Sequence, residues 1–465
     1  MKTVPYGSWR SPITPELIVG RVVGLGDVRL DGDATYFLES RPAEGGRSVV
    51  MKRSADGTLA EVTPAPFNVR TRVHEYGGGA YTVHAGVVYF SNFADNRLYR
   101  VQPDQPPQAL TPDVAMRYAD ACVDERRRRL ICVREDHTGP GEAVNTLVSV
   151  PMDPSQGTTV LVDGCDFYSS ARVSPDGKRL AWLSWNHPNM PWDGTELWVA
   201  DIADDGSVAS AHKVAGGLTE SIFQPEFAPD GTLYFISDRS NWWNIYRVRE
   251  ERIEPVLVKD AEFGAPQWGF GMSTYGFRSA DEMVCSYSEA GHTHVLLVDL
   301  AALTHKEIAL GEFDIAGGIR VALDRFGFSG SSETRPGGVA LYDFSSSSCS
   351  IIKRSTDWVI DEAYVGRAEP IEFPTDGGMT AHGYYYAPRN PDFAGPPDER
   401  PPLLVICHGG PTSATSVAFN PSIRYWTSRG FGVLDVNYGG SAGYGRAYRQ
   451  RLNGQWGVVD VNDCT

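Results

Sequence analysis

The sequence predicts a β-propeller over residues 1–360, with a short N-terminal extension, and the beginning of a parallel α/β sheet over residues 361–465. Three observations predict this organisation. Short β-rich runs alternate with Gly, Asp, Pro and Asn turns, without long helical periodicity, as far as about residue 355. One hairpin pattern recurs through that region. After residue 360 the recurrence stops, and a strand–helix–strand pattern begins.

The recurring pattern is a strand, a turn and an apolar strand. Its clearest copies, Val173–Ser184 and Phe227–Ser237, both contain a Pro-Asp-Gly turn, which predicts hairpins. Weaker copies raise the number of turn positions to seven: Asp31, Gly86, Asp124, Asp176, Asp230, Asp281 and Asp324. These positions are 38 to 55 residues apart, and such spacing is typical of four-stranded blades in a seven-bladed propeller. The alternative, two stacked β-sandwiches, gives no reason for the regular spacing.

The second part contains a predicted strand–helix–strand unit. Leu403–Cys407 is a continuous apolar run between proline and glycine, which predicts a strand covered on both faces, as in a parallel sheet. Asn420 is a good N-cap, a proline follows it, and Gly430 ends the predicted helix. Phe431–Asn437 is the next buried strand. A hairpin that turns at Asp376-Gly-Gly precedes the unit.

The first of these strands ends at the turn His408-Gly-Gly-Pro411. Such a turn lies at the carboxyl end of a parallel strand, where α/β folds bind ligands. In α/β-hydrolases a turn of this kind supplies one backbone N–H to the oxyanion hole. A plain glycine-rich turn explains the same four residues equally well when they are taken alone.

Further motifs follow in a fixed order. They are Asn437-Tyr-Gly-Gly-Ser-Ala-Gly-Tyr-Gly445, Gly454-Gln-Trp-Gly457 and Asp460-Val-Asn-Asp-Cys464. Together with the His-Gly-Gly-Pro turn, they make the chain resemble the prolyl oligopeptidase family of serine peptidases, in its acylaminoacyl-peptidase and dipeptidyl-aminopeptidase-like branch. The stretch Gln224-Pro-Glu-Phe-Ala-Pro-Asp-Gly231 resembles the propeller of the same branch. One departure is the pair Gly439-Gly440, where the family has a single glycine before the serine.

The resemblance implies a β-propeller that gates access to an α/β-hydrolase domain, with short peptides cleaved between the two. It implies that the backbone N–H of Gly410, held by His408 and Gly409, stabilises the oxyanion. The family's serine, aspartate and histidine would follow residue 465. We therefore expect a fragment with only the N-terminal part of the α/β-hydrolase domain, inactive alone.

A G-x-S-x-G pattern does occur, with Ser441 at its centre. We reject Ser441 as a nucleophile because it comes only 33 residues after His408, one strand–helix–strand step. In addition, no histidine follows His408 in the sequence to act as its general base. An earlier histidine such as His382 stays open, since triads occur in several chain orders. We expect Ser441 to be a loop residue near the cavity.

Two other segments contain candidate site residues. Residues 72–79 place charged and aromatic side chains beside three glycines, which predicts a tight turn with Arg72 and Glu75 as candidate substrate-binding residues. His292 and His294 place two imidazoles on one strand face. No third ligand is evident there, so we predict no metal site, and no motif indicates a cofactor.

Composition limits the function classes. The formal net charge of −16 disfavours nucleic acid and anionic membranes as partners. Residues 1–20 lack a signal-peptide pattern, and no run approaches the ~18 apolar residues of a membrane span. Seven scattered cysteines predict reduced thiols. We expect a cytoplasmic peptidase acting on peptides, with homo-oligomers left open; a non-catalytic propeller binding protein and an esterase-type hydrolase are the alternatives.

Overall fold

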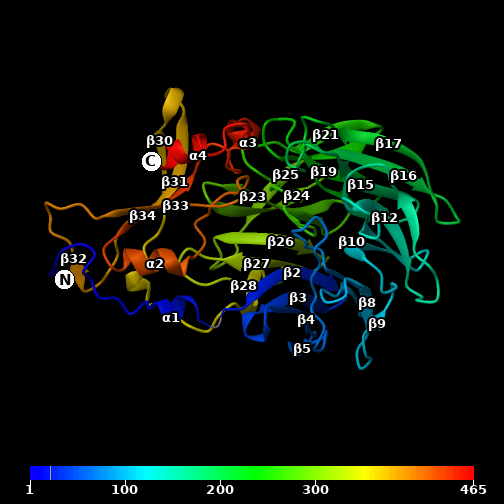
Figure 1. Cartoon of the computed structure of the whole chain (residues 1–465), viewed down its shortest axis with the longest axis horizontal. Coiled ribbons are helices and arrows are strands. Elements are labelled where there is room, and N and C mark those ends of the chain that lie inside the picture. Colours follow the sequence, from blue (N-terminus) through cyan, green and yellow to red (C-terminus); the bar gives the residue numbers. More distant parts are fainter. Residues whose placement is uncertain (21) are drawn as a thin grey trace.

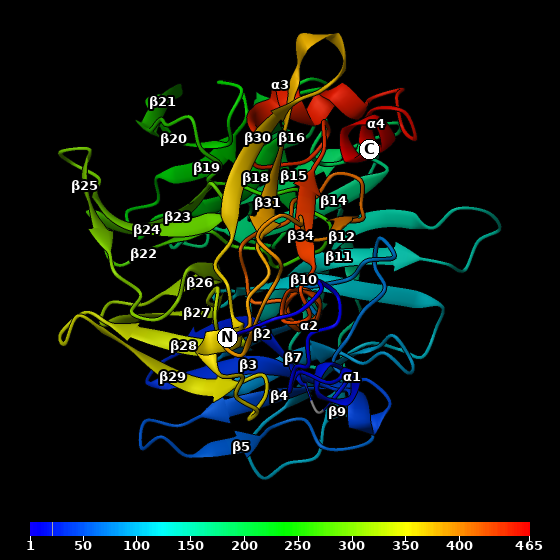
Figure 2. The same cartoon turned by 90° about the vertical axis from the view of Figure 1, so that its left-hand side faces the viewer.

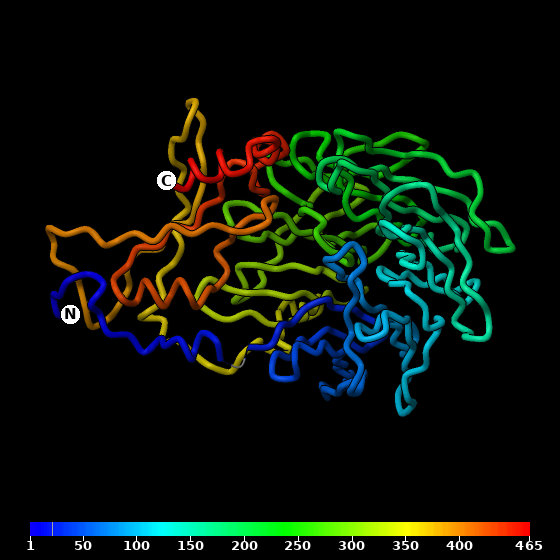
Figure 3. Tube along the Cα trace, in the orientation of Figure 1, coloured from blue at the N-terminus to red at the C-terminus, as the bar shows by residue number. Residues whose placement is uncertain are grey.

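The structure, a computed structural model, describes residues 1–20 and 22–465. Its larger part is a ring of β-sheets, seen from the side in Figure 1 and from one face in Figure 2. A smaller mixed sheet lies over one face of the ring, and both chain termini lie in this smaller part. The same arrangement can be followed along the Cα trace in Figure 3.

The ring consists, among the described residues, of seven four-stranded antiparallel sheets in which the strands pair in chain order. The first sheet contains β2 (Gly24–Asp31), β3 (Ala34–Arg41), β4 (Arg47–Arg53) and β5 (Leu59–Glu61), and the second contains β6 (Tyr81–His84), β7 (Val87–Ser91), β8 (Leu98–Val101) and β9 (Gln108–Ala109). The third contains β10 (Met116–Asp124), β11 (Arg129–Asp136), β12 (Val144–Pro151) and β13 (Thr159–Val162). The fourth contains β14 (Phe167–Val173), β15 (Arg179–Trp185), β16 (Glu196–Ile202) and β17 (Val208–Gly216). The other three contain β18 (Ile222–Phe227), β19 (Leu233–Ser237), β20 (Asn244–Arg249), β21 (Arg252–Leu257); β22 (Tyr275–Phe277), β23 (Glu282–Glu289), β24 (His292–Asp299), β25 (Thr304–Ile308); and β26 (Ile315–Val321), β27 (Arg325–Ser331), β28 (Gly338–Asp343), β29 (Ser348–Arg354). Five of the seven predicted turn positions lie between the first and second strand of one sheet, and the other two, Asp31 and Asp124, are the last residues of the first strands β2 and β10.

The last sheet of the ring packs against the first. Val28 of β2 lies so close to Gly327 of β27 that a Cβ on this glycine would come within 2.7 Å of the valine Cγ1. Between neighbouring sheets, apolar side chains such as Leu183 and Phe235 share one core cluster. A closed ring of four-stranded antiparallel sheets is consistent with a β-propeller, in which packing between blades buries what no sheet could bury alone.

The first strands of five sheets carry a β-bulge. Their registers shift next to residues with positive φ, which are Asp27, Asp120, Ser170, Gln224 and Gly318. A bulge re-aims the side chains that follow it. Arg29, Arg172, Glu226 and Arg320 each come two residues after a bulge, and all four line cavities in the ring.

The smaller sheet has the strand order β30-β31-β34-β33. Its strands are β30 (Glu369–Pro374), β31 (Thr380–Tyr386), β34 (Gly432–Asn437) and β33 (Leu403–Cys407), and only the β33–β34 pair is parallel. The helices after the ring are α2 (Pro421–Thr427), α3 (Gly445–Arg449) and α4 (Val459–Cys464), with 3₁₀ turns η2 (Glu362–Tyr364), η3 (Asp376–Gly378) and η4 (Gln450–Leu452). A further 3₁₀ turn, η1 (Pro42–Glu44), joins β3 to β4 in the ring. Helix α2 joins β33 to β34, and its predicted N-cap is confirmed: the Ser422 N–H donates to Asn420 Oδ1 at 2.9 Å. None of the helices in the described residues is long and apolar enough to cross a bilayer.

The prediction that Leu403–Cys407 forms a strand covered on both faces is wrong for the structure described. Strand β33 is the edge of its sheet, and Leu403, Val405 and Ile406 are 52%, 41% and 38% exposed. Strand β34, which lies between β31 and β33, is mostly buried. An apolar run shows that a strand suits a covered position, but it does not show how many neighbours the strand has.

The N-terminal segment packs with the smaller sheet instead of the ring. Strand β1 (Lys2–Thr3) pairs in parallel with β32 (Phe393–Ala394). The short helix α1 (Pro15–Ile18) follows, and Ile13 shares a core cluster with Ile360 and Val365. The first residues of the chain therefore tie the smaller sheet to the segment that leaves the ring.

Candidate functional site at the turn after β33

The turn after β33 presents backbone donors at the face of the ring. Gly410 has φ +143°, a conformation that favours glycine. The N–H groups of Gly409 and Gly410 donate to no other residue within 1–20 and 22–465, so both can bind an oxygen atom of a ligand. From the ring, Trp268 Nε1 donates to the Thr412 carbonyl oxygen at 2.6 Å, which fixes the far side of the turn.

The His408 side chain makes two short hydrogen bonds and a longer contact of 3.4 Å between its Nδ1 and the Tyr438 hydroxyl. Its Nδ1 lies 2.9 Å from the Gly409 carbonyl oxygen, and its Nε2 lies 2.7 Å from Ser441 Oγ. Because a carbonyl oxygen only accepts, we assign the proton to Nδ1, and the Ser441 hydroxyl then donates to Nε2. Burial lowers the pKa of His408, so this neutral tautomer is favoured at neutral pH.

A hydroxyl that donates to a histidine is also the geometry of nucleophilic catalysis. Two features argue against that role here. Ser441 is fully buried, and the Nδ1 side of the ring bonds a backbone carbonyl where a triad has a carboxylate. The contact instead joins two loops, since the Ala442 N–H also donates to the Ser413 carbonyl oxygen at 2.7 Å.

The sequence pattern does not predict the His408–Ser441 contact, because it indicates His408 only as part of a turn. A signal for it does exist. Both loops follow parallel strands, β33 and β34, that are neighbours in one sheet. The carboxyl ends of such strands meet at the same edge, so polar residues that follow them directly are candidates for contact.

Helix α3 anchors the smaller part on the ring through a buried charge cluster. Asp238 of the ring has a fully buried side chain, and its Oδ2 lies 2.6 Å from both Arg446 and Arg449. Nearby, the Gly445 N–H donates to Glu262 Oε1 at 3.0 Å. Burial raises the pKa of Glu262 and lowers that of Arg449. The sequence does not reveal this cluster, because the partners are about two hundred residues apart.

The candidate substrate-binding residues lie on an exposed loop of the ring. Arg72 pairs with Glu75 at 3.0 Å, and Glu75 also pairs with Arg117 at 3.0 Å. Hydrogen bonds from Arg117 and Arg72 lower the pKa of Glu75. The next residue, Tyr76, contacts Trp268 with ring centroids 4.8 Å apart. The structure therefore places this loop beside the tryptophan that contacts the 408–413 turn, and Arg72 and Glu75 bond each other.

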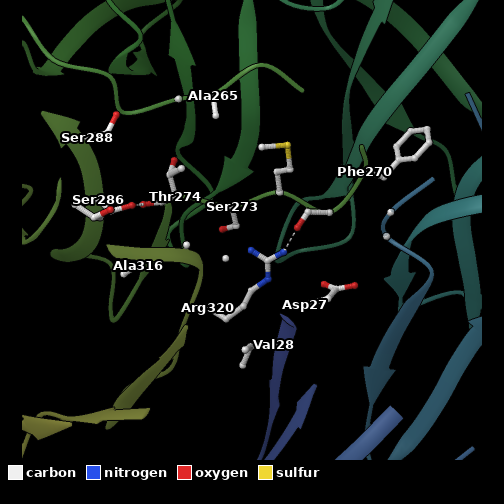
Figure 4. A pocket seen from close by; sticks show the side chains of 18 of the residues that line it. Asp27, Val28, Ala265, Phe270, Ser273, Thr274, Ser286, Ser288, Ala316 and Arg320 are labelled. Carbon is white, nitrogen blue, oxygen red and sulfur yellow. Dashed lines mark hydrogen bonds between the residues drawn. The ribbon is translucent and has the colours of Figure 1, made fainter. Parts of the chain in front are cut away.

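Two cavities of the ring share part of their lining. Figure 4 shows one, of about 460 Å³, where Arg320 donates to the Gly271 carbonyl oxygen at 2.6 Å. The other, of about 520 Å³, shares Arg29, Met272, Ser273 and Arg320 with it. Burial lowers the pKa of Arg320. These shared side chains stand between the two cavities.

The two histidines that were considered as a metal pair have separate partners. His292 Nε2 lies 2.9 Å from Glu333 Oε1, and His294 Nδ1 lies 2.7 Å from Glu307 Oε1. Each imidazole is therefore engaged by its own carboxylate.

Comparison with known proteins identifies related sequences. Residues 417–465 match the model of the prolyl oligopeptidase family. The chain is 43% identical over 63 residues to the acylamino-acid-releasing enzyme of Arabidopsis thaliana, a match to 14% of this chain and 8% of that protein. It is 33% identical over 89 residues to dipeptidyl aminopeptidase BIII of Pseudoxanthomonas mexicana, a match to 19% of this chain and 13% of that protein. The matches therefore span only a small share of these relatives.

Solved structures match over the whole chain. A puromycin hydrolase is 37% identical with a TM-score of 0.93, and the match covers 99% of this chain and 73% of the other. A puromycin-hydrolysing peptidase of Mycobacterium tuberculosis is 35% identical with a TM-score of 0.94, covering 100% of this chain and 74% of the other. An acylaminoacyl peptidase of Pyrococcus horikoshii shares the fold at 15% identity and a TM-score of 0.64. The chain belongs to the prolyl oligopeptidase family.

Proposed function

We propose that the protein is a serine-type peptidase that hydrolyses short peptides. The observation that carries the proposal is its likeness, over essentially the whole chain, to puromycin-hydrolysing enzymes at 35–37% identity. We further propose that residues 1–360 form a seven-bladed propeller that gates access, and that residues 361–465 form part of an α/β-hydrolase domain. Two cavities of the ring share Arg29, Met272, Ser273 and Arg320, and this succession of cavities supports the gating role.

In this proposal the Gly410 N–H stabilises the oxyanion of the reaction, and His408 and Gly409 hold the turn that presents it. The unpaired N–H and the glycine-favouring backbone support this role. One such donor contributes about 10²–10³ to a hydrolytic rate, or roughly 3–4 kcal/mol. Arg72 and Glu75 would contact substrate from the ring, and their loop beside Trp268 supports that placement.

We also propose that Ser441 is not the nucleophile, and that the serine, aspartate and histidine of catalysis lie outside residues 1–465. The complete burial of Ser441 and the carbonyl partner of His408 support this. Residues 1–465 alone would then be inactive.

A fluorophosphonate probe tests these proposals. It should label a form of the protein that extends beyond residue 465 and leave residues 1–465 unlabelled. Labelling of residues 1–465 at Ser441 would contradict the assignment, and an unlabelled longer form would contradict the serine mechanism. In a labelled form, faster cleavage of p-nitrophenyl esters than of matched peptide p-nitroanilides would favour the esterase alternative.

A further inference from the structure

We infer that an aromatic cavity in the ring, beside the 408–413 turn, is a binding site for an uncharged aromatic side chain of a peptide. The identification of the ligand as a peptide rests on the proposed function. The cavity shares only Phe270 with the cavity of Figure 4 and no lining residue with the 520 Å³ cavity, and it has a volume of about 140 Å³. A cavity of about 150 Å³ with apolar walls can hold a benzene molecule, so this one has room for a phenyl ring.

The walls of the cavity are aromatic rings in mutual contact. Phe167 and Trp185 are stacked, with centroids 5.4 Å apart and planes 17° apart. The His74 ring stands edge-on to both, at 5.0 Å and 5.5 Å. On the other side, Trp192 and Trp268 pack at 4.4 Å. Such walls offer both the faces and the edges that a further aromatic ring prefers to contact.

The lining favours a neutral ligand. None of the 14 lining residues is Asp, Glu, Lys or Arg. Burial lowers the pKa of His74 to about 4, so this histidine is neutral at neutral pH. A charged group that entered the cavity would lose its hydration without gaining a counter-ion. Two carboxylates beside the lining already have partners: Glu135 accepts from the His74 backbone N–H at 2.6 Å, and Asp193 accepts from the Met190 N–H at 3.1 Å. Glu75, at the Tyr76 end, and Asp166, bonded to His187, are exposed residues outside the lining.

One lining residue, Gln267, carries a buried polar atom, Oε1, without a hydrogen-bond partner in the described structure. A buried polar atom that stays unpaired is unfavourable, so this atom is a candidate for a bond to a ligand. The Gln267 carbonyl oxygen can accept from a peptide N–H or a phenol O–H. The cavity thus combines apolar walls with the few polar groups that orient a ligand.

The position of the cavity links it to the site. Trp268 lines it and also donates to the Thr412 carbonyl oxygen at 2.6 Å, four residues after His408. Tyr76, at the cavity's exposed end, contacts the same tryptophan. A peptide whose aromatic side chain occupied the cavity would therefore be held beside the turn that carries Gly410.

Calorimetric titration of residues 1–465 with three small amides tests the inference. N-acetyl-phenylalanine amide should bind at least about tenfold more tightly than the alanine and lysine amides. Phe167→Ala should reduce the phenylalanine preference about three- to tenfold, since each aromatic contact adds about that much. Tyr76→Ala, at a 64% exposed position, should reduce it without disturbing the core. The matched control is Trp456→Ala, which removes a 66% exposed aromatic ring outside the cavity and should leave the preference unchanged.

Equal affinity for the three amides, tighter binding of the lysine amide, or a preference that survives both Phe167→Ala and Tyr76→Ala would overturn the inference. The readout needs no cleavage. Failure of fluorophosphonate labelling in a longer form therefore counts against the peptidase proposal alone. If a form labelled by the fluorophosphonate shows no preference for the phenylalanine amide, the result contradicts the proposed role of the cavity and leaves the peptidase proposal intact.

Discussion

Two strands of similar composition, one in the ring and one in the smaller sheet, differ in how much of their side chains is exposed. Strand β19 of the ring, Leu233–Ser237, is buried along its whole length. Strand β33, Leu403–Cys407, is equally apolar, yet Leu403, Val405 and Ile406 are exposed. Strand β19 lies between β18 and β20, and its side chains share core clusters with the sheets before and after its own. Strand β33 is at the edge of its sheet. Burial is thus decided by the neighbours that the architecture supplies and not by the composition of the strand.

The comparison also shows which part supports the other. The smaller sheet rests on the ring through the Asp238 cluster and the Trp268–Thr412 hydrogen bond. The ring closes on itself through its own first and last sheets. We infer that the ring is the scaffold and that the turn with Gly410 is positioned by it.

The largest expected effect comes from breaking the contact between the two parts. Asp238→Ala leaves Arg446 and Arg449 buried without their shared carboxylate, which should cost about 3–5 kcal/mol. Urea unfolding should show the loss, first in the smaller part. Asp204→Ala is the control, because the Asp204–Arg126 pair is exposed and should contribute under about 1 kcal/mol. Equal effects of the two substitutions would contradict the scaffold role.

The same substitution in the two strands sharpens the comparison. Ile236→Ala in β19 removes a fully buried side chain and should cost about 2–5 kcal/mol. Ile406→Ala in β33 removes one that is 38% exposed and should change stability by a few tenths to about 1 kcal/mol. Denaturant midpoints of the two variants measure the difference. A loss at Ile406 as large as at Ile236 would mean that β33 is covered in solution.

A pH titration addresses the ring alone. The pKa of His74 is about 4 in the folded protein, against about 6.5 unfolded, so the unfolded chain binds more protons between these values. Stability should therefore fall as the pH drops from about 6.5 to 4, by up to about 3 kcal/mol from this group. His74→Gln should remove that component from the pH dependence of unfolding. An unchanged slope in the variant would contradict a buried neutral His74.

The smallest effect is expected inside the smaller part. Ser441→Ala removes the hydroxyl that donates to His408 Nε2 and should cost about 0.5–1.5 kcal/mol. Because that bond favours the neutral ring, the pKa of His408 should rise, as measured by NMR of the imidazole protons. Ser416→Ala, whose hydroxyl accepts only a 3.4 Å bond from the Ala418 N–H, should leave this pKa unchanged. An unchanged His408 pKa in Ser441→Ala would show that the contact is weak.

Local features of the fold could be predicted from the sequence. Turns such as Pro175-Asp-Gly177 and the Asn420 cap depend on residues within a few positions of each other. Their structures follow from turn and cap chemistry alone, and a regular spacing of such turns indicates a repeat. This is why the seven hairpin positions and the helix α2 were predictable.

Features that depend on distant contacts were not predictable. The exposure of β33 depends on its place in the sheet. The His408–Ser441 hydrogen bond forms only because two loops lie side by side. The Asp238 cluster joins the ring to helix α3, and the aromatic cavity joins rings from Phe167 to Trp268. No pattern within one segment encodes these pairings. Of the candidate site, the sequence therefore predicts only the turn that begins at His408.

Native-state hydrogen exchange tests most directly the claim that the ring is the stable scaffold and β33 its weakest neighbour. Ile236 lies on β19, between β18 and β20. Its amide should exchange only through global unfolding. The amides of β33 should exchange through local opening, at rates at least about 100-fold higher. Equal protection of β19 and β33 would contradict the account.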